Sequence, residues 1–301
     1  MSPQLIKIVI IGAGEIGQAL ALVFRKQGAQ VDLWDRDLSR VPNQKSLENL
    51  VPKADYLFLC VPSQAVRPVV QTISSLIRKK TGVICLSKGV ELKTKKFMPE
   101  VLRELLPVGQ PFALCGGPML AEELMQKKPG VFVLASKKLP SFVKLSKLLS
   151  GSVIRLELTS DVMGVAAAGV LKNIYAMALG MAAELGWGAN AEAWLVSQCL
   201  TEMEKITVKL GSREETVCYT AGLGDLIATG FSPYSKNRQT GSELVKTGKC
   251  CVGGEGAISF PAVWSRLGIL TKNFPILIML RKILMQKQNA KKLFENYFQK
   301  S

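Results

Sequence analysis

The feature that most constrains the fold of this chain lies at its amino end, where an apolar run leads into closely spaced glycines. Leu5–Ile11 is almost continuously apolar, which is typical of a central parallel strand buried on both faces. It is followed by GAGEIG (Gly12–Gly17), a predicted helix at Gln18–Gln27, a strand at Gln30–Trp34 and the carboxylate of Asp35. Such a glycine turn lets a pyrophosphate approach a helix amino terminus. The order therefore predicts a dinucleotide-binding βαβ unit, the alternative being an ordinary glycine turn without a ligand.

Alternation of strands and helices continues to about residue 159. Further strands are predicted at Tyr56–Cys60, Gly82–Leu86, Pro111–Cys115, Val131–Ala135 and Ser152–Glu157, and helices at Gln64–Lys79, Pro99–Leu106, Leu120–Gln126 and Pro140–Leu149. This pattern predicts an α/β class domain over 1–159, a doubly wound Rossmann-type sheet that binds a dinucleotide. Ligands of such sheets bind at the carboxyl ends of the strands. We therefore expect Lys88 and the glycine pair Gly116–Gly117, which follow two of these strands, to lie near the ligand.

From residue 160 the pattern is helical, which predicts an all-helical domain over 160–301. Its helices are predicted at Val162–Ala183, Ala189–Lys209, Ile258–Leu267, Pro275–Met285 and Ala290–Phe298. The change of class near residue 160, without a low-complexity linker, marks the predicted domain boundary.

The first of these helices carries a single charge, Lys172, in an otherwise apolar segment long enough to span a bilayer. A lysine at mid-span would cost roughly 2.5–3.5 kcal/mol on insertion. A helix that is apolar all round is otherwise a core helix, so no membrane insertion is expected. A buried ammonium requires a carboxylate, a cavity or a ligand. Lys172 and its neighbour Asn173 are therefore candidate site residues, the alternative being a lysine that snorkels to the surface.

The composition bears on the partners of the protein and on metal binding. The formal net charge is +16, which favours an anionic partner without selecting among a small ligand, nucleic acid and an acidic surface. No nucleic-acid recognition motif is present, so no nucleic-acid partner is expected. Cys60, Cys85 and Cys115 close apolar runs as small hydrophobes, and with Cys250–Cys251 adjacent and no CxxC a metal site is not expected. The amino terminus has no cleavable signal, so the protein is expected to be cytoplasmic.

The absence of histidine restricts acid–base chemistry to Lys, Asp, Glu, Tyr and Cys. A dinucleotide domain followed by a helical domain with one buried lysine suggests a dehydrogenase in which that lysine exchanges the proton at a carbonyl oxygen. Burial would lower the pKa of Lys172 towards neutrality, whereas a nearby carboxylate such as Asp225 would raise it.

Five further segments carry a resemblance to a known family. These are SKGVE (87–91), GGPMLAEE (116–123), GVLKNIYAMALGM (169–181), AGLGDLIATGFSPYSKN (221–237) and GGEG (253–256). With the opening GAGEIG, they resemble NAD(P)-dependent glycerol-3-phosphate dehydrogenases in the same order over nearly the whole chain. The resemblance implies an oxidoreductase that interconverts dihydroxyacetone phosphate and sn-glycerol 3-phosphate and supplies phospholipid synthesis. It implies a small phosphorylated three-carbon substrate and leaves a homodimer open.

The resemblance also implies the roles of individual residues. Lys172 would exchange the proton, with Lys88 and Asp225 as further catalytic residues. The substrate-binding residues would be Lys88, Gly117, Met119, Lys172, Asn173, Asp225, Ser235, Lys236 and Asn237. The cofactor-binding residues would be Gly12, Gly14, Glu15, Ile16, Gly17, Asp35, Arg36, Lys88, Ala121, Lys236, Gly253 and Glu255.

The cofactor implied is NAD or NADP. A carboxylate at Asp35 favours NAD because it accepts from the ribose 2′-hydroxyl and repels a 2′-phosphate, whereas Arg36 would attract that phosphate.

The chain departs from the family's usual residues at Ile16 (Trp), Met119 (Ser or Thr), Leu120 (Phe) and Lys236 (Arg), and the segment from Asp35 to Asp55 is shorter. Two other readings therefore stay open: a reductase of another small 2-oxo compound, and a nicotinamide-binding regulator with weak turnover.

Overall fold

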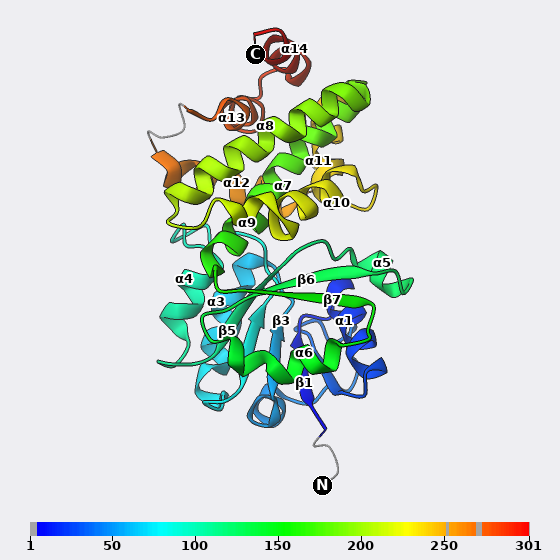
Figure 1. Ribbon diagram of the computed structural model, residues 1–301, viewed down its shortest axis with the longest axis vertical. Coiled ribbons are helices and arrows are strands. Elements are labelled where there is room, and N and C mark those ends of the chain that lie inside the picture. The colour runs from blue at the N-terminus through cyan, green and yellow to red at the C-terminus, as the bar shows by residue number, and fades with distance from the viewer. Residues whose placement is uncertain (1–4, 251–252, 269–272, 301) are drawn as a thin grey trace. The chain divides into compact units, whose positions relative to one another are not determined.

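Seven strands form one sheet in the computed structural model, which describes residues 5–250, 253–268 and 273–300, so Cys251 lies outside the described residues. The order across the sheet is β2-β1-β3-β4-β5-β6-β7. Figure 1 labels β1, β3, β5, β6 and β7 among these strands. The strands are β1 (Lys7–Ile11), β2 (Gln30–Trp34), β3 (Tyr56–Leu59), β4 (Gly82–Cys85), β5 (Phe112–Gly116), β6 (Gly130–Ala135) and β7 (Ile154–Thr159). The order reverses between β1 and β3, and such a switch point is where sheets of this kind bind their ligands.

The alternation of strands and helices in the sequence did not specify the direction of every strand. Strands β1 to β5 pair in parallel, but β6 pairs with β5 antiparallel, and β7 runs parallel to β6. The predicted doubly wound architecture is confirmed for the five strands that carry the glycine turn and the loops after β4 and β5.

Short and medium-length helices connect the strands. They are α1 (Glu15–Lys26), α2 (Leu47–Leu50), α3 (Ser63–Ile73), α4 (Met98–Leu105), α5 (Ala121–Met125) and α6 (Val143–Leu149), with single turns η1 (Val51–Lys53), η2 (Ser74–Leu76) and η3 (Leu139–Phe142). The sheet core is aromatic at its centre, where the Phe58 ring centroid lies 4.9 Å from that of Phe24 and 6.3 Å from that of Phe132. The three rings belong to one core cluster, which covers one face of the sheet together with alternate residues of its strands such as Ile8 and Ile10.

The chain divides into two compact units. The first comprises Met1–Lys88 and Lys96–Ala166, and the second comprises Gly89–Lys95 and Ala167–Ser301. The sequence placed a boundary between 159 and 160, where the strands end. The loop Gly89–Lys95 belongs with the second unit because Val90 N donates to Ser259 Oγ at 3.1 Å and Arg266 donates to the Lys95 carbonyl at 3.0 Å.

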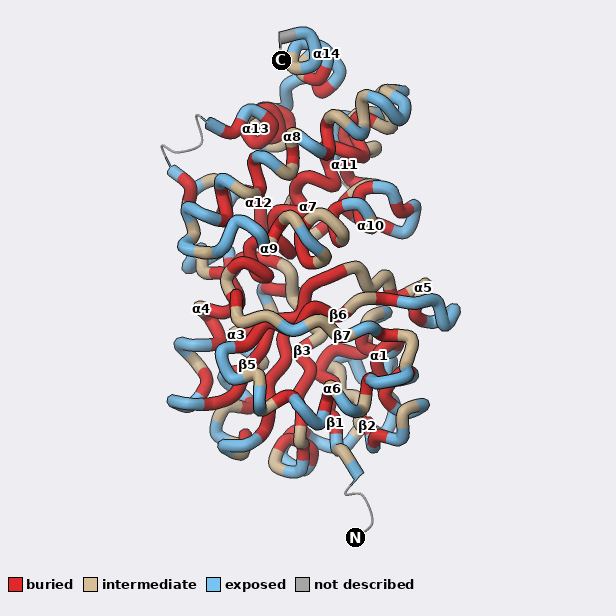
Figure 2. The backbone as a smooth tube through the Cα atoms, in the orientation of Figure 1, coloured by how far each residue is buried: buried red, intermediate tan, exposed pale blue. Residues whose placement is uncertain are grey.

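Helices make up the second unit, and its central helix α7 (Val162–Glu184) is buried along nearly its whole length (Figure 2). The others are α8 (Gly188–Lys209), α9 (Glu215–Cys218), the π-helical turn η4 (Thr220–Gly224), α10 (Asp225–Phe231), α11 (Lys236–Thr247), α12 (Glu255–Leu267), α13 (Pro275–Gln286) and α14 (Ala290–Lys300). Among the described residues, α7 is the one helix long and apolar enough to cross a membrane, and 94% of its most apolar window is buried inside the protein. That burial is the environment of a core helix.

Candidate functional site

The glycines of the turn after β1 have different physical roles. Gly12 has φ +104°, and a Cβ there would lie 2.5 Å from the Cys60 carbonyl oxygen. A Cβ on Gly17 would lie 2.0 Å from the Gly12 carbonyl oxygen. Gly14 is different, because the nearest atom to a Cβ added there would be Arg40 Nη1, at 3.7 Å. Gly12 and Gly17 are therefore required by packing, whereas Gly14 leaves open space for a ligand at the start of α1.

Asp35 connects the end of β2 to this glycine turn. Its Oδ2 accepts from Ala13 N at 2.7 Å and its Oδ1 accepts from Asp37 N at 2.9 Å. Arg40 Nη1 lies 3.7 Å from the same Oδ2, and Arg40 Nε lies 3.6 Å from an Asp37 oxygen. The carboxylate is thus oriented by two backbone donors and a cation before any ligand binds.

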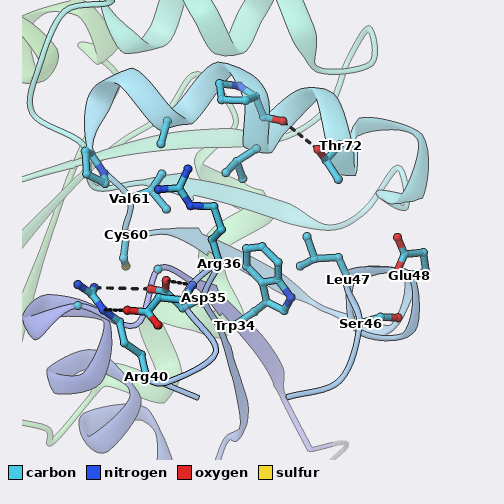
Figure 3. Close-up of a pocket in the computed structure, with 17 residues that line it drawn as sticks. Trp34, Asp35, Arg36, Arg40, Ser46, Leu47, Glu48, Cys60, Val61 and Thr72 are labelled. Carbon is cyan, nitrogen blue, oxygen red and sulfur yellow. Dashed lines mark hydrogen bonds and ion pairs between the residues drawn. The ribbon is translucent and has the colours of Figure 1, made fainter. Parts of the chain in front are cut away.

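A cavity of about 860 Å³ opens beside this carboxylate. It is lined by the turn, the end of β2, Cys60 and Val61 after β3, and α3. Figure 3 shows the Arg40 guanidinium turned towards Asp35 and the Arg36 side chain turned the other way. The volume lies within the range of small-molecule sites, and the cavity lies at the β1/β3 switch point, where a dinucleotide would be expected.

Two of the predicted residues at the carboxyl ends of the strands meet. Lys88 Nζ, in the loop after β4, donates to the Gly117 carbonyl oxygen after β5 at 3.0 Å. Gly117 has φ +92°, and a Cβ there would lie 2.6 Å from the Val131 carbonyl oxygen. Gly117 is therefore required by its close packing against β6, and Lys88 holds its carbonyl oxygen.

Four other predicted residues of the first unit have simpler environments. Ile16 and Met119 pack against the hydrophobic core, and Ala121 is buried at the start of α5. Glu15 is exposed in the first turn of α1. These contacts explain the apolar residues as packing and leave their roles towards a ligand as predictions.

In the second unit, Lys172 is buried and has two partners on one helix. Its Nζ lies 2.9 Å from Asp225 Oδ1 and donates to Thr229 Oγ1 at 2.6 Å. Thr229 Oγ1 in turn donates to Asp225 Oδ1 at 3.3 Å. The side chains of Lys172 and Asp225 are 8% and 3% exposed, so this is a desolvated ion pair rather than a lysine that snorkels to the surface.

The glycine-rich stretch before α10 positions Asp225. Residues Thr220–Gly224 form a π-helical turn, which is frequent at functional sites. A Cβ on Gly222 would lie 2.1 Å from the Val217 carbonyl oxygen, and a Cβ on Gly230 would lie 2.3 Å from Leu179 Cδ1 of α7. The absence of side chains at both positions lets α10 approach α7 closely enough for Asp225 to reach Lys172.

Asn173 starts a second polar chain next to Lys172. Asn237 Nδ2 donates to Asn173 Oδ1 at 2.9 Å, and Asn237 Oδ1 accepts from Gly256 N at 2.9 Å. A Cβ on Gly254 would lie 2.4 Å from Asn237 Oδ1. The predicted asparagines and the GGEG segment are therefore brought together by direct hydrogen bonds.

The remaining predicted residues of this unit lie around the same elements. Ser235 caps α11, since its Oγ accepts from Arg238 N at 3.2 Å. Lys236 is exposed in the first turn of α11. Gly253 is exposed with φ +67°, and Glu255 opens α12. Across the described ranges, no group of three or more cysteine or acidic side chains could hold a metal ion.

Sequence reasoning did not single out Thr229 and Arg40. Thr229 lies four residues after Asp225, the spacing that places two side chains on one helix face, so the signal was present in the sequence. Arg40 lies in a loop, where no periodicity indicates that it would lie beside Asp35.

Comparison with known proteins finds the same family in both units of the chain. Residues 38–141 match the family described as NAD-dependent glycerol-3-phosphate dehydrogenase N-terminus, and residues 161–295 match the corresponding C-terminus. Glycerol-3-phosphate dehydrogenase [NAD(P)+] from Clostridium botulinum is 30% identical, with 95% of this chain and 94% of the relative covered. Glycerol-3-phosphate dehydrogenase [NAD(P)+] 2 from Sphingopyxis alaskensis is 35% identical over 80% of this chain and 78% of its own length. The crystal structure of glycerol-3-phosphate dehydrogenase from Coxiella burnetii superposes with a TM-score of 0.87 at 28% identity, covering 98% of this chain and 99% of that one.

Proposed function

The chain belongs to the NAD(P)-dependent glycerol-3-phosphate dehydrogenase family, and we propose that it interconverts dihydroxyacetone phosphate and sn-glycerol 3-phosphate. The observation that supports a working enzyme is the buried ion pair of Lys172 and Asp225 with Thr229. Removing two charges from water costs free energy of folding, and a protein with apolar residues of similar size in place of the pair would often be at least as stable. The pair is therefore better explained by function than by stability.

Lys172 exchanges the proton in this proposal. A bound nicotinamide supplies the hydride to the carbonyl carbon in one direction and accepts it in the other. In reduction, the Lys172 ammonium donates a proton to the carbonyl oxygen as the hydroxyl forms, and in oxidation the neutral amine accepts that proton. Asp225 and Thr229 hold Nζ in place, and Asp225 compensates the buried charge.

The first unit holds the cofactor, with the pyrophosphate at the turn around Gly14. Asp35 accepts a hydrogen bond from the 2′-hydroxyl of the adenosine ribose. We therefore propose that the enzyme prefers NAD(H). Arg36 and Arg40 line the same cavity and would attract a 2′-phosphate. Comparing kcat/KM for NADH and NADPH tests this preference, and a clear advantage of NADPH would show that the arginines outweigh the carboxylate.

The substrate phosphate is assigned to Lys236, with Ser235 and Asn237 beside it, and Lys88 and Gly117 are assigned to the rest of the substrate. Lys236 is an exposed cation in the first turn of α11. A helix amino terminus favours an anion, which adds to the attraction of the ammonium.

One assay tests the proposed reaction. Oxidation of NADH and of NADPH is followed by absorbance with dihydroxyacetone phosphate as substrate, and saturable turnover is expected. Unphosphorylated dihydroxyacetone and a small 2-oxo acid serve as controls. Faster turnover of a 2-oxo acid than of the phosphorylated ketone would replace this function with that of another reductase, and no turnover of any substrate would favour a regulator.

We also propose that the product supplies phospholipid synthesis and that the enzyme acts in the cytoplasm. A homodimer is the simplest assembly for an enzyme of this size. Light scattering coupled to gel filtration would measure its mass against the 32.7 kDa of one chain.

A further inference from the structure

A second cavity, which we call the basic groove, opens at the amino ends of β1 and β3. It has a volume of about 750 Å³ and lies at the ends of these strands opposite to Gly12 and Cys60. Its cationic side chains are Lys7, Lys53, Arg78, Lys80 and Lys144, and its one carboxylate is Asp55. Five of its twelve lining residues are cationic, against 39 Lys and Arg in 301 residues, so the overall basic composition does not account for the cluster.

The carboxylate in the groove already has partners. Asp55 Oδ2 accepts from the backbone N of Lys7 at 2.9 Å, and Asp55 Oδ1 lies 3.8 Å from Arg78. In the part of the chain that the structure describes, the ammonium groups of Lys7, Lys53, Lys80 and Lys144 form no ion pair. Like charges gathered in one hollow repel each other, and an anion bound among them would relieve that repulsion.

Arg78 provides a second observation. Its Nη2 donates to the Ala54 carbonyl oxygen at 2.7 Å, which fixes the guanidinium at the groove wall. Its Nε is buried and has no hydrogen-bond partner among the described residues. The guanidinium is therefore a fixed positive charge in the wall of the groove, and guanidinium groups bind phosphate oxygens well.

The walls of the groove are held rigidly by backbone contacts. Thr81 Oγ1 donates to the Ala54 carbonyl at 2.8 Å, which ties the turn before β4 to the start of β3. Tyr56 OH donates to the Ser141 carbonyl at 3.1 Å and accepts from Leu145 N at 3.2 Å, which ties α6 to β3. The backbone around the groove is thus held in place, so binding of an anion orders mainly the lysine side chains.

We propose that the basic groove binds an anion with a chain of two or three phosphates. Five cations and one carboxylate leave a formal charge of +4 in the groove. A di- or triphosphate chain, with about three to four negative charges at neutral pH, balances that charge, whereas a single phosphate does not. The volume fits a ligand of nucleotide size. This site is separate from the cofactor cavity, because the two cavities share no lining residue.

Calorimetric titration with inorganic tripolyphosphate tests the proposal. The protein is first saturated with NADH, so that the cofactor cavity is occupied. The triple variant Lys53→Ala, Lys80→Ala and Lys144→Ala removes three exposed cations of the groove and is expected to weaken binding tenfold or more. The control variant Lys128→Ala, Lys137→Ala and Lys209→Ala makes the same change in net charge on exposed lysines outside the groove, and its affinity should match the wild type.

Equal weakening in both variants would show that general basicity attracts the anion, and the proposal would be wrong. Loss of binding on saturation with NADH, or no binding by the wild-type enzyme, would also overturn it. Thermal unfolding of both variants, with midpoints within a few degrees of the wild type, establishes that any loss comes from the removed charges.

Discussion

At the residue scale, Lys172 combines burial with charge. Asp225 and Thr229 lie within hydrogen-bonding distance of its ammonium and offset the cost of burying a charge in an apolar core. The same contacts fix the direction of Nζ, which a proton donor needs. A buried and oriented ammonium is what the proposed proton transfer requires.

Replacement of Lys172 tests its assigned role. Lys172→Ala is expected to lower kcat for dihydroxyacetone phosphate reduction by about 10²- to 10⁴-fold, the usual contribution of a positioned general acid. The Kd for NADH, measured by fluorescence, should change less than twofold. Because the variant leaves Asp225 buried without its cation, Lys172→Met with Asp225→Asn serves as a paired-charge control and should be equally inactive. Near-normal kcat in either protein would refute the assignment.

Gly14 and Gly17 provide a second test at this scale. Gly14→Ala places a methyl group in open space beside Arg40, so stability should be retained while the Kd for NADH rises about tenfold or more, because the methyl group occupies space that the pyrophosphate needs. Gly17→Ala instead places a methyl group 2.0 Å from a carbonyl oxygen and should lower the midpoint of thermal unfolding by several degrees. Equal thermal destabilisation by the two substitutions would contradict this division of roles.

At the element scale, three helices of the second unit meet at one buried carboxylate. Glu202 of α8 accepts from Ile276 N at 2.6 Å and Leu277 N at 3.2 Å, at the start of α13, and from Tyr175 OH of α7 at 2.8 Å. Burial raises the pKa of Glu202 to about 7, although these hydrogen bonds act in the opposite direction. The carboxyl therefore serves as a helix cap in an environment that favours its neutral form.

This carboxyl predicts a pH dependence of stability. Below pH 4.5 Glu202 is protonated in both the folded and unfolded states, and above pH 7 it is ionised in both. Between these values the unfolded state binds fewer protons, so the free energy of unfolding should fall as pH rises, by about 3 kcal/mol in total.

Glu202→Gln should remove most of that slope, as measured by urea unfolding at pH 5 and pH 7.5. Glu104, whose pKa is lowered to about 2 by its hydrogen bonds with Arg67 and Lys96, affects stability only at lower pH and does not mask the effect. An equally steep slope in the Glu202→Gln protein would assign the titration to another group.

At the scale of the whole molecule, the net charge of +16 should act on a substrate that carries two negative charges at neutral pH. Raising the ionic strength from about 0.01 M to 0.15 M shortens the Debye length from about 30 Å to 8 Å. We therefore expect kcat/KM for dihydroxyacetone phosphate to fall several-fold over this range, measured at saturating NADH. The rate with unphosphorylated dihydroxyacetone should stay nearly constant, and an equal fall for both ketones would show a general effect of salt on the enzyme.

Local sequence determined the elements and their chemistry. Apolar runs and glycines predicted the β1–α1–β2 unit, and the isolated charge of Lys172 predicted a buried cation with a partner. These features depend on neighbours within a few residues, where backbone geometry and side-chain burial act directly. Asp225 was a candidate partner of Lys172 before any family was considered, and the resemblance to glycerol-3-phosphate dehydrogenases assigned roles to it and to Asn237. No local pattern links these two residues to Lys172 or Asn173.

Only the tertiary structure decided which distant groups meet. The antiparallel direction of β6, the attachment of Gly89–Lys95 to the second unit and the position of Arg40 beside Asp35 have no local signature. The same holds for the basic groove, whose cations come from four separate segments of the chain. The attachment of Gly89–Lys95 and the basic groove depend on contacts between residues far apart in sequence, whose energy is set by how the finished elements pack. The Arg40–Asp35 contact is close in sequence, but it depends on the path of an irregular loop, for which the sequence has no periodic pattern.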